Sequence, residues 1–302
     1  MAYLHSDREQ FRDAIDLAYE QTGVMVQAIE KDYYVTMLLR LLAQKMPYIV
    51  FKGGTSLSKC HKVIRRFSED IDITIDTLLS QGQKKKIKQA IVDSAQELGM
   101  TIENLDETRS RRDYNRYVIA YDSVIPMASD ALKAAVLLET SYTAVSFPTV
   151  LLPVHSYIGD MMEQEAPDAI EEYNLNPFEM KVQGIDRTLA DKVFAICDYY
   201  LQGKVAKHSR HLYDIYKLLP LVPQNENFRE LVKEVRAVRA QSVVCPSALP
   251  EADVPELLEK IIKERAYKQD YDSLTTQLLE ENMPYDTVIA ALKKVAENSL
   301  FE

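Results

Sequence analysis

The sequence has few cysteines and no long hydrophobic run. Its three cysteines, Cys60, Cys197 and Cys245, lie far apart, and no two of them have C-x-x-C spacing. This pattern argues against a disulfide framework or a zinc site and is typical of buried free thiols. No stretch approaches the roughly 20 uninterrupted apolar residues of a membrane span, and the start, MAYLHSDREQ, lacks the basic-then-apolar layout of a signal peptide. We therefore expect a cytoplasmic protein without a membrane partner.

Two widespread catalytic motifs are also missing. The G-x-x-x-x-G-K-[ST] loop that binds phosphate in P-loop proteins is absent, and so is the G-x-S-x-G turn of serine hydrolases. No internal repeat or low-complexity tract interrupts the 302 residues. At about 150 residues per domain, this length indicates a globular chain of roughly two domains.

Positive charge is in deficit. The chain carries 36 Lys and Arg against 46 Asp and Glu, a formal net charge of −10. An acidic protein does not coat nucleic acid through bulk charge. The deficit is uneven, because residues 1–150 carry 19 basic and 20 acidic side chains whereas residues 151–302 carry 17 and 26. A local basic face on the first half therefore remains possible.

The hydrophobic pattern predicts a mixed α/β half followed by a helical half. In the first half, the pattern predicts a helix capped by Ser6, helices over about 26–45 and 81–98, and strands over 48–51, 68–76, 117–121 and 134–140. Further along, it predicts helices over 186–201, 208–219, 228–240 and 254–267, followed by a C-terminal pair. We predict an α/β domain over residues 1–170 and a helical domain over residues 171–302.

A glycine turn is the first feature that points to chemistry. The run YIVF (48–51) is typical of a strand, and it stops at Gly53 and Gly54 before a short helix with Thr55 or Ser56 as its N-cap. A glycine turn at a helix N-terminus leaves backbone N–H groups free to bind a phosphate. On its own, a Gly-Gly pair before a helix is commonly only a turn.

A pair of aspartates follows the glycine turn. In the strand 68–76, acidic residues alternate with isoleucine, so Asp70 and Asp72 share one face. Two such carboxylates can chelate Mg²⁺ together with phosphate oxygens and water, although a D-x-D pair is also found on solvated edge strands. Because turn and aspartates occur together in this order, they predict a site for a metal-bound nucleoside triphosphate. Metal ions there could activate an attacking hydroxyl and stabilise the pyrophosphate leaving group.

These residues belong to a recognisable run. FKGGTSLSKCHKVIRRFSEDIDI closely resembles the first motif of the AbiEii/AbiGii-type nucleotidyltransferase toxins, a branch of the DNA-polymerase-β-like superfamily that includes the MenT toxins. IEKDYYV (29–35) resembles the N-terminal signature of the longer members, and RTLADKVFAI (187–196) and SRHLYDIYKLL (209–219) resemble the two later motifs. The resemblance implies a polymerase-β-like mixed-sheet core of α/β (α+β) class, followed by a helical C-terminal domain.

The resemblance also implies roles for individual residues. Asp70 and Asp72 would hold Mg²⁺ or Mn²⁺, and Ser68 lies where a functional serine precedes the first aspartate. Asp214 would complete the site from the helical domain. The residues implied to contact the triphosphate are Gly53, Gly54, Thr55, Ser56, Lys192 and Arg210.

Three of the candidate residues have simpler interpretations. Lys192 by itself is typical of a surface helix lysine, and Asp214 could form an i,i+4 pair with Arg210, worth only a few tenths of a kcal/mol. Many enzymes of the superfamily use a third carboxylate on a later strand. Glu139 in AAVLLETSY is our candidate, because an acid among apolar neighbours is costly in a strand core. A solvent-facing Glu139 is the alternative.

Basic clusters lie in the first half of the chain. Their members are Lys59, Lys62, Arg65 and Arg66, then Lys84, Lys85, Lys86 and Lys88, then Arg109, Arg111, Arg112 and Arg116. Tyr114 and Tyr117 interleave with the last cluster, a composition that suits phosphate binding and base stacking, although any one cluster could be a solvated face. For an RNA substrate, we expect the 109–116 segment and the Arg65/Arg66 pair to line its path.

The sequence thus predicts an Mg²⁺-dependent nucleotidyltransferase that transfers an NMP from an NTP and releases pyrophosphate. The resemblance implies the toxin of a bacterial toxin–antitoxin pair of the abortive-infection type, with the tRNA 3′ end as acceptor and a small DNA-binding antitoxin as partner. Two alternatives remain open: NMP or phosphate transfer to a protein side chain, and a non-catalytic nucleotide-binding protein.

Overall fold

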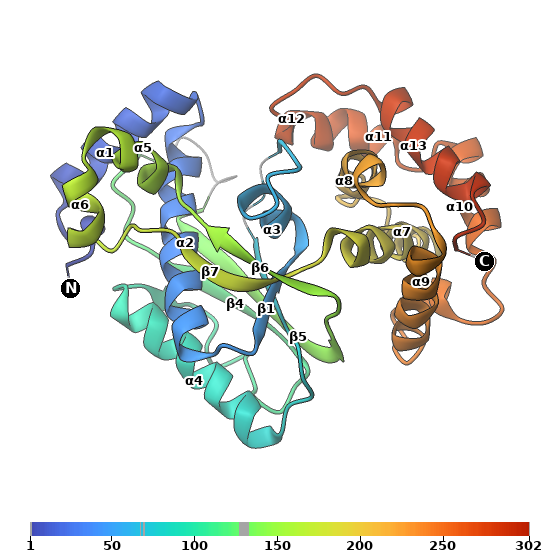
Figure 1. The fold of residues 1–302 in the computed structure, drawn as a ribbon, viewed down its shortest axis with the longest axis horizontal. Coiled ribbons are helices and arrows are strands. Elements are labelled where there is room, and N and C mark those ends of the chain that lie inside the picture. Colours follow the sequence, from blue (N-terminus) through green and yellow to red (C-terminus); the bar gives the residue numbers. More distant parts are fainter. Residues whose placement is uncertain (1, 67, 69, 127–132, 302) are drawn as a thin grey trace. The chain divides into compact units, whose positions relative to one another are not determined.

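The computed structural model describes residues 2–66, 68, 70–126 and 133–301, and Figure 1 shows its ribbon. The chain forms two compact units. Unit 1 comprises Met1–Cys60 and Ser68–Val182, and unit 2 comprises His61–Phe67 and Gln183–Glu302. The boundary predicted from the sequence, between residues 170 and 171, lies before the last segment of unit 1, which ends at Val182. That segment contains most of the strand Phe178–Gln183, whose sequence has little periodic pattern.

Unit 1 is built on a seven-stranded mixed sheet with the order β3-β4-β5-β2-β1-β7-β6. Strand β1 pairs antiparallel with β2 and parallel with β7, while β5 pairs parallel with β2 and antiparallel with β4. The strands are β1 (Ile49–Lys52), β2 (Asp70–Ile75), β3 (Thr101–Ile102), β4 (Tyr114–Ala120), β5 (Ala135–Val145), β6 (Thr149–Val154) and β7 (Phe178–Gln183). The four predicted strands are present, β4 begins three residues earlier than predicted, and Glu69 of the predicted 68–76 strand lies outside the described residues.

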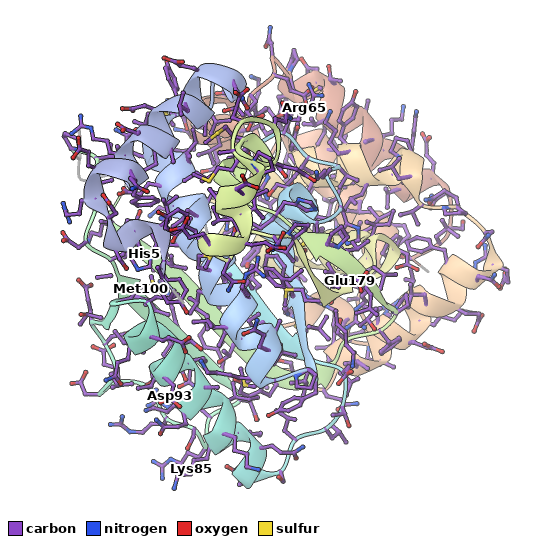
Figure 2. All side chains as sticks on the ribbon, turned by 60° about the vertical axis from the view of Figure 1, so that its left-hand side comes forward. His5, Arg65, Lys85, Asp93, Met100 and Glu179 are labelled. Atoms are coloured by element: carbon purple, nitrogen blue, oxygen red, sulfur yellow. The ribbon has the colours of Figure 1, made fainter. Side chains whose placement is uncertain are left out.

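Helices of unit 1 bury the apolar face of the sheet that carries Ile71 and Ile73. Helix α2 is buried along most of its length, because apolar residues occupy nearly all of its sides, and it packs against α1, α4 and α5. Asp7, rather than the predicted Ser6, caps α1 by accepting from two backbone N–H groups. The helices are α1 (Arg8–Thr22), α2 (Val26–Lys45), α3 (Gly53–Lys59), α4 (Gln81–Glu97), α5 (Tyr157–Glu165) and α6 (Pro167–Glu172). Figure 2 labels Lys85 and Asp93 on the exposed side of α4.

Unit 2 is helical, as predicted. Helix α7 packs against α8, α9 and α10, and α13 packs against α8 and α10. The helices are α7 (Ile185–Leu201), α8 (Arg210–Leu218), α9 (Glu226–Arg239), α10 (Val254–Glu264), α11 (Lys268–Asp270), α12 (Thr276–Leu278) and α13 (Tyr285–Glu297), with a π turn at Tyr271–Thr275. Within the described residues, no helix is long and apolar enough to cross a membrane.

All three cysteines are free thiols. The expectation of free thiols is therefore confirmed. Cys60 and Cys197 are buried, as expected, whereas Cys245 is only half-buried. Burial raises the pKa of the Cys197 thiol, which therefore remains protonated and unreactive at neutral pH.

A segment between the glycine turn and the aspartates belongs to unit 2. The backbone of Arg66 forms an antiparallel bridge with Leu279, and the carbonyl of Arg65 accepts from the N–H of Glu280 at 3.1 Å. The N–H of Arg65 donates to the hydroxyl of Tyr213 at 3.0 Å, and that hydroxyl donates to Glu281. These bonds hold the segment between α8 and the chain just before α13.

Candidate nucleotide-binding site

The glycine turn brings the backbone against an aspartate. Strand β1 ends at Lys52 and α3 begins at Gly53, whose φ of +80° lies in the left-handed region that favours glycine. Lys52 is directly opposite Asp72 in the antiparallel β1–β2 pair. A Cβ on Gly53 would consequently lie 1.9 Å from Oδ2 of Asp72. Both the backbone angle and the adjacent carboxylate therefore require glycine at position 53.

The first turn of α3 has no side-chain cap among the described residues. Lys52 occupies the N-cap position, so the prediction that Thr55 or Ser56 caps this helix is wrong. The hydroxyl of Ser56 donates instead to the carbonyl of Gly53 at 2.9 Å, and the Ser56 side chain is fully buried. The backbone N–H groups of the first turn, rather than the Ser56 hydroxyl, are thus the groups suited to a phosphate.

The two aspartates lie side by side on one face of β2. Ile71 and Ile73 are buried on the opposite face, whereas Asp70 and Asp72 are half-buried, as the alternation predicted. Strand β5 pairs with β2 so that Glu139 is directly opposite Asp72, which places its side chain on the aspartates' face. The Glu139 side chain is 32% exposed and lies 3.8 Å from Nε of Arg116. It is therefore neither in the strand core nor fully in solvent.

The carboxylates suit a hard divalent cation. In the part of the chain that the structure describes, no three His, Cys, Asp or Glu side chains form a metal cluster, so Asp70, Asp72 and Glu139 together are not a preformed three-ligand cage. Mg²⁺ commonly takes only one or two carboxylates and completes its shell with water and substrate phosphates. Asp70 and Asp72, next to the tight approach of Gly53, fit that pattern without Glu139.

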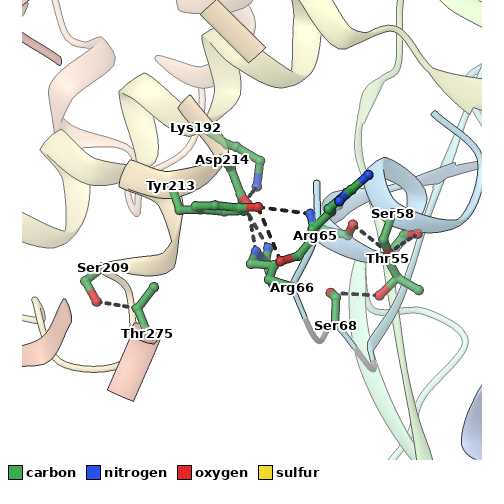
Figure 3. A network of polar contacts seen from close by, with 12 residues as sticks. Thr55, Ser58, Arg65, Arg66, Ser68, Lys192, Ser209, Tyr213, Asp214 and Thr275 are labelled. Atoms are coloured by element: carbon green, nitrogen blue, oxygen red, sulfur yellow. Dashed lines mark hydrogen bonds and ion pairs between the residues drawn. The ribbon is translucent and has the colours of Figure 1, made fainter. Parts of the chain in front are cut away.

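Ser68 contacts the α3 helix. Its hydroxyl lies 2.9 Å from that of Thr55, and either oxygen can be the donor (Figure 3). Thr55 is buried and Ser68 is half-buried. This bond ties the chain just before Asp70 to the helix that follows the glycine turn.

A second charged cluster lies inside unit 2. Asp214 on α8 is fully buried and accepts from Nε and Nη2 of Arg66 at 2.7 and 2.8 Å, and from Nζ of Lys192 at 2.6 Å (Figure 3). Asp214 thus pairs with Arg66 and Lys192, and not with Arg210 as the i,i+4 spacing suggested. Burial opposes ionisation of Asp214, but Arg66 and Lys192 outweigh it and hold the pKa of that carboxyl well below its usual range.

Burial in this cluster also lowers the pKa values of Lys192 and of the adjacent His211. Burial lowers the pKa of the Lys192 ammonium, Asp214 opposes this shift, and Arg66 adds to it. Burial, reinforced by Lys192, lowers the pKa of His211 well below its usual value, so this imidazole is neutral at pH 7. Lys192 is 6% exposed, which corrects its interpretation as a surface helix lysine.

The first basic cluster does not form a surface. The Arg66 side chain is 2% exposed because it binds Asp214, and Lys59 is buried against Asp32, with Nζ 2.5 Å from Oδ1. Of that cluster, Lys62 and Arg65 remain exposed. The expectation that Arg66 lines an RNA path is therefore wrong. Two adjacent arginines look alike in sequence, and only a partner 148 residues away distinguishes them.

Gly53→Ala is expected to destabilise the fold and abolish nucleotide transfer. The added methyl group would collide with Asp72 at a backbone angle that L-residues rarely adopt, at a cost of about 1–3 kcal/mol. Thermal unfolding and a labelled-NTP transfer assay measure the two effects. Gly23→Ala is a matched control, since Gly23 has a similar φ of +70° but nothing within 4 Å of the place that the added methyl group would occupy. Equal losses in both variants would contradict the role assigned to the Asp72 contact.

Comparison with known proteins identifies the family. The family model described as nucleotidyl transferase AbiEii toxin, type IV TA system, matches residues 36–294. Among solved structures, MenT4, the nucleotidyltransferase toxin Rv2826c from Mycobacterium tuberculosis H37Rv, is similar in fold, with a TM-score of 0.52 and 16% identity over 94% of this chain and 88% of that chain. No curated protein matches the chain. With the predicted sheet core and helical second half both present, the chain belongs to the AbiEii family of nucleotidyltransferase toxins, which act in type IV toxin–antitoxin systems.

Proposed function

We propose that this nucleotidyltransferase transfers an NMP from an Mg²⁺-bound NTP to the 3′ end of an RNA, with tRNA as the acceptor. The observation that carries the proposal is the close approach of Gly53 to Asp72, which places a helix turn that has no side-chain cap among the described residues next to two carboxylates. Backbone N–H groups bind phosphate oxygens, and carboxylates bind the cation that accompanies them. This pairing suits a nucleoside triphosphate better than an uncharged substrate.

Each part of the site has a distinct task in this proposal. Asp70 and Asp72 hold the divalent cation, and the first turn of α3 binds and orients the triphosphate. When bound, Mg²⁺ neutralises phosphate charge and lowers the pKa of the acceptor hydroxyl. The bond between Thr55 and Ser68 keeps the start of β2 against α3. The roles implied for Lys192, Arg210 and Asp214 in phosphate binding and catalysis stay predictions.

The second partner in this proposal is the antitoxin. Membership of a type IV toxin–antitoxin family implies such a partner. We propose that it is a small DNA-binding protein in the same cytoplasm, encoded beside the toxin. A gene neighbourhood without such a protein would contradict this part of the proposal.

A transfer assay tests the reaction and its metal requirement. The purified protein is incubated with Mg²⁺, total tRNA and each α-³²P-labelled NTP in turn, and the products are separated on a denaturing gel. We expect label on the tRNA band. The label should disappear with EDTA and return with excess Mg²⁺ or Mn²⁺, because the two anionic carboxylates repel a triphosphate unless a divalent cation lies between them. No transfer with any NTP would refute the proposal, and label on the protein band alone would favour a protein acceptor.

A further inference from the structure

The face that carries the aspartates continues across two neighbouring strands. Asp72 on β2 is directly opposite Glu139 on β5, and Glu139 is directly opposite Arg116 on β4. Residues that face one another across paired strands point to the same side of the sheet, and so does Tyr114, two residues before Arg116. One row of side chains therefore leads from the aspartates to an arginine and a tyrosine.

Both residues contact Glu139 while remaining open to solvent. Nε of Arg116 lies 3.8 Å from Oε1 of Glu139, and the Tyr114 hydroxyl donates to the same carboxylate. The Arg116 side chain is 53% exposed and Tyr114 is 51% exposed. An exposed ion pair at this distance contributes little to stability, so the guanidinium can exchange Glu139 for a phosphate.

The neighbouring residues of the same cluster are engaged elsewhere. Tyr117 is fully buried, and Arg109 and Arg112 donate to backbone carbonyls of their own loop, those of Asp106, Thr108 and Glu107. Of the 109–116 segment that we expected to contact RNA, Tyr114 and Arg116 are therefore the residues available for this contact near the carboxylates.

Further cations lie on α4 and on the loop before β4. Lys84 on α4 pairs with Asp113 at 2.5 Å, and Lys88 donates to the carbonyl of Thr108 at 2.9 Å. These bonds join the start of α4 to the loop before β4. Three exposed cations lie on the joined elements: Lys85, Lys86 and Arg111. Lys85 projects from α4 in Figure 2.

We propose that Tyr114 and Arg116 bind the terminal nucleotide of a single-stranded RNA acceptor. The ring of Tyr114 stacks on the terminal base, and the Arg116 guanidinium binds the phosphate next to it. An acceptor strand that approaches Asp70, Asp72 and Glu139 meets like charge, and Arg116 on their row is a cation that is open to solvent. Stacking on an aromatic ring tolerates any base, while the planar arginine suits phosphate geometry. The inference rests on the proposed function, because it names the residues that receive the acceptor.

Acceptor affinity and turnover are measured separately to test it. Binding of a fluorescent single-stranded RNA with a free 3′ end is followed by anisotropy without NTP, and transfer to tRNA is followed with labelled NTP. We expect Tyr114→Ala to weaken RNA binding and raise the acceptor KM about tenfold while leaving the NTP KM within twofold. Tyr114→Phe should retain more affinity than Tyr114→Ala, since it keeps the ring. Arg116→Gln should weaken binding and reduce its dependence on salt.

Controls separate the possible outcomes. Tyr19→Ala removes a tyrosine of similar exposure, and Arg12→Gln removes an exposed arginine, both on α1. Unchanged RNA binding by Tyr114→Ala and Arg116→Gln would overturn the inference even if the wild-type protein transfers NMP to tRNA. If Tyr114→Ala and Arg116→Gln weaken RNA binding as expected but the wild-type protein transfers no NMP, the proposed function is refuted and the RNA-binding inference is supported. Label on the peptide that contains Tyr114, absent from Tyr114→Phe, would show that this hydroxyl is itself the acceptor and would overturn the inference too.

Discussion

Asp70→Asn and Asp72→Asn should each lower kcat/KM for NMP transfer by roughly 10³-fold, about 4 kcal/mol of transition-state stabilisation. The amide keeps the shape of the side chain but removes the negative charge that, in the proposed function, would hold the divalent cation. Without that cation, both the triphosphate and the developing charge on pyrophosphate would lose their largest stabilising partner. Single-turnover transfer of α-labelled NTP to tRNA measures the loss.

The matched control for this prediction comes from the same part of the sheet. Asp76 directly follows β2 and pairs with Lys181, away from the glycine turn. Asp76→Asn should retain most of the activity, and all three variants should unfold at similar temperatures. A variant at Asp70 or Asp72 that keeps more than about a tenth of wild-type kcat/KM would contradict the proposed metal-binding role.

Asp214→Ala is expected to destabilise the protein by about 3–5 kcal/mol. The change leaves Arg66 and Lys192 buried without their anion, and an uncompensated buried charge is among the most costly defects in a fold. Because the pKa of Asp214 lies below its usual value, the contribution is present at every pH above about 4 and is lost only as the pH falls further. Urea unfolding followed by circular dichroism at pH 7 measures it.

Two further variants separate stability from chemistry at this cluster. The triple variant Arg66→Met, Lys192→Met, Asp214→Leu should recover most of the lost stability, because apolar side chains of similar volume can replace a buried ionic triad. We expect that folded triple variant to remain inactive if Lys192 and Asp214 have the roles that the family motifs imply. Glu230→Ala, which breaks an exposed pair with Lys233 on α9, should change stability by no more than about 0.5 kcal/mol. A triple variant with wild-type transfer would restrict the cluster to a structural role.

The strand that carries the aspartates could be predicted because its pattern is local. Alternating isoleucine and aspartate gives both the element and the face on which Asp70 and Asp72 lie. Strands β6 and β7 have no comparable signal: β6 contains Pro153 and β7 reads FEMKVQ. They take their place through pairing with segments far away in the chain, so the sequence pattern misses them.

The contacts around the site depend on register and long-range partners. The glycine turn indicated a phosphate site, but only the pairing of Lys52 with Asp72 shows why position 53 excludes a side chain. Likewise, the predicted strand begins at Tyr117, so the prediction does not place Tyr114 and Arg116 on a strand face with Glu139. Extending the predicted strand by three residues would have revealed the period-two spacing, although not its neighbour on β5.

The excursion of residues 61–67 into unit 2 makes that unit discontinuous in sequence. A polypeptide of residues 183–302 alone would lack Arg66, leave Asp214 with one cation instead of two, and expose the backbone of Leu279 that the excursion pairs. The helical half is therefore not an autonomous folding module. The C-terminal helices alone could not be exchanged for those of a homologue, because the first motif of the family supplies structural parts to both units. Recombination between such toxins should succeed only when residues 61–67 travel with the C-terminal helices.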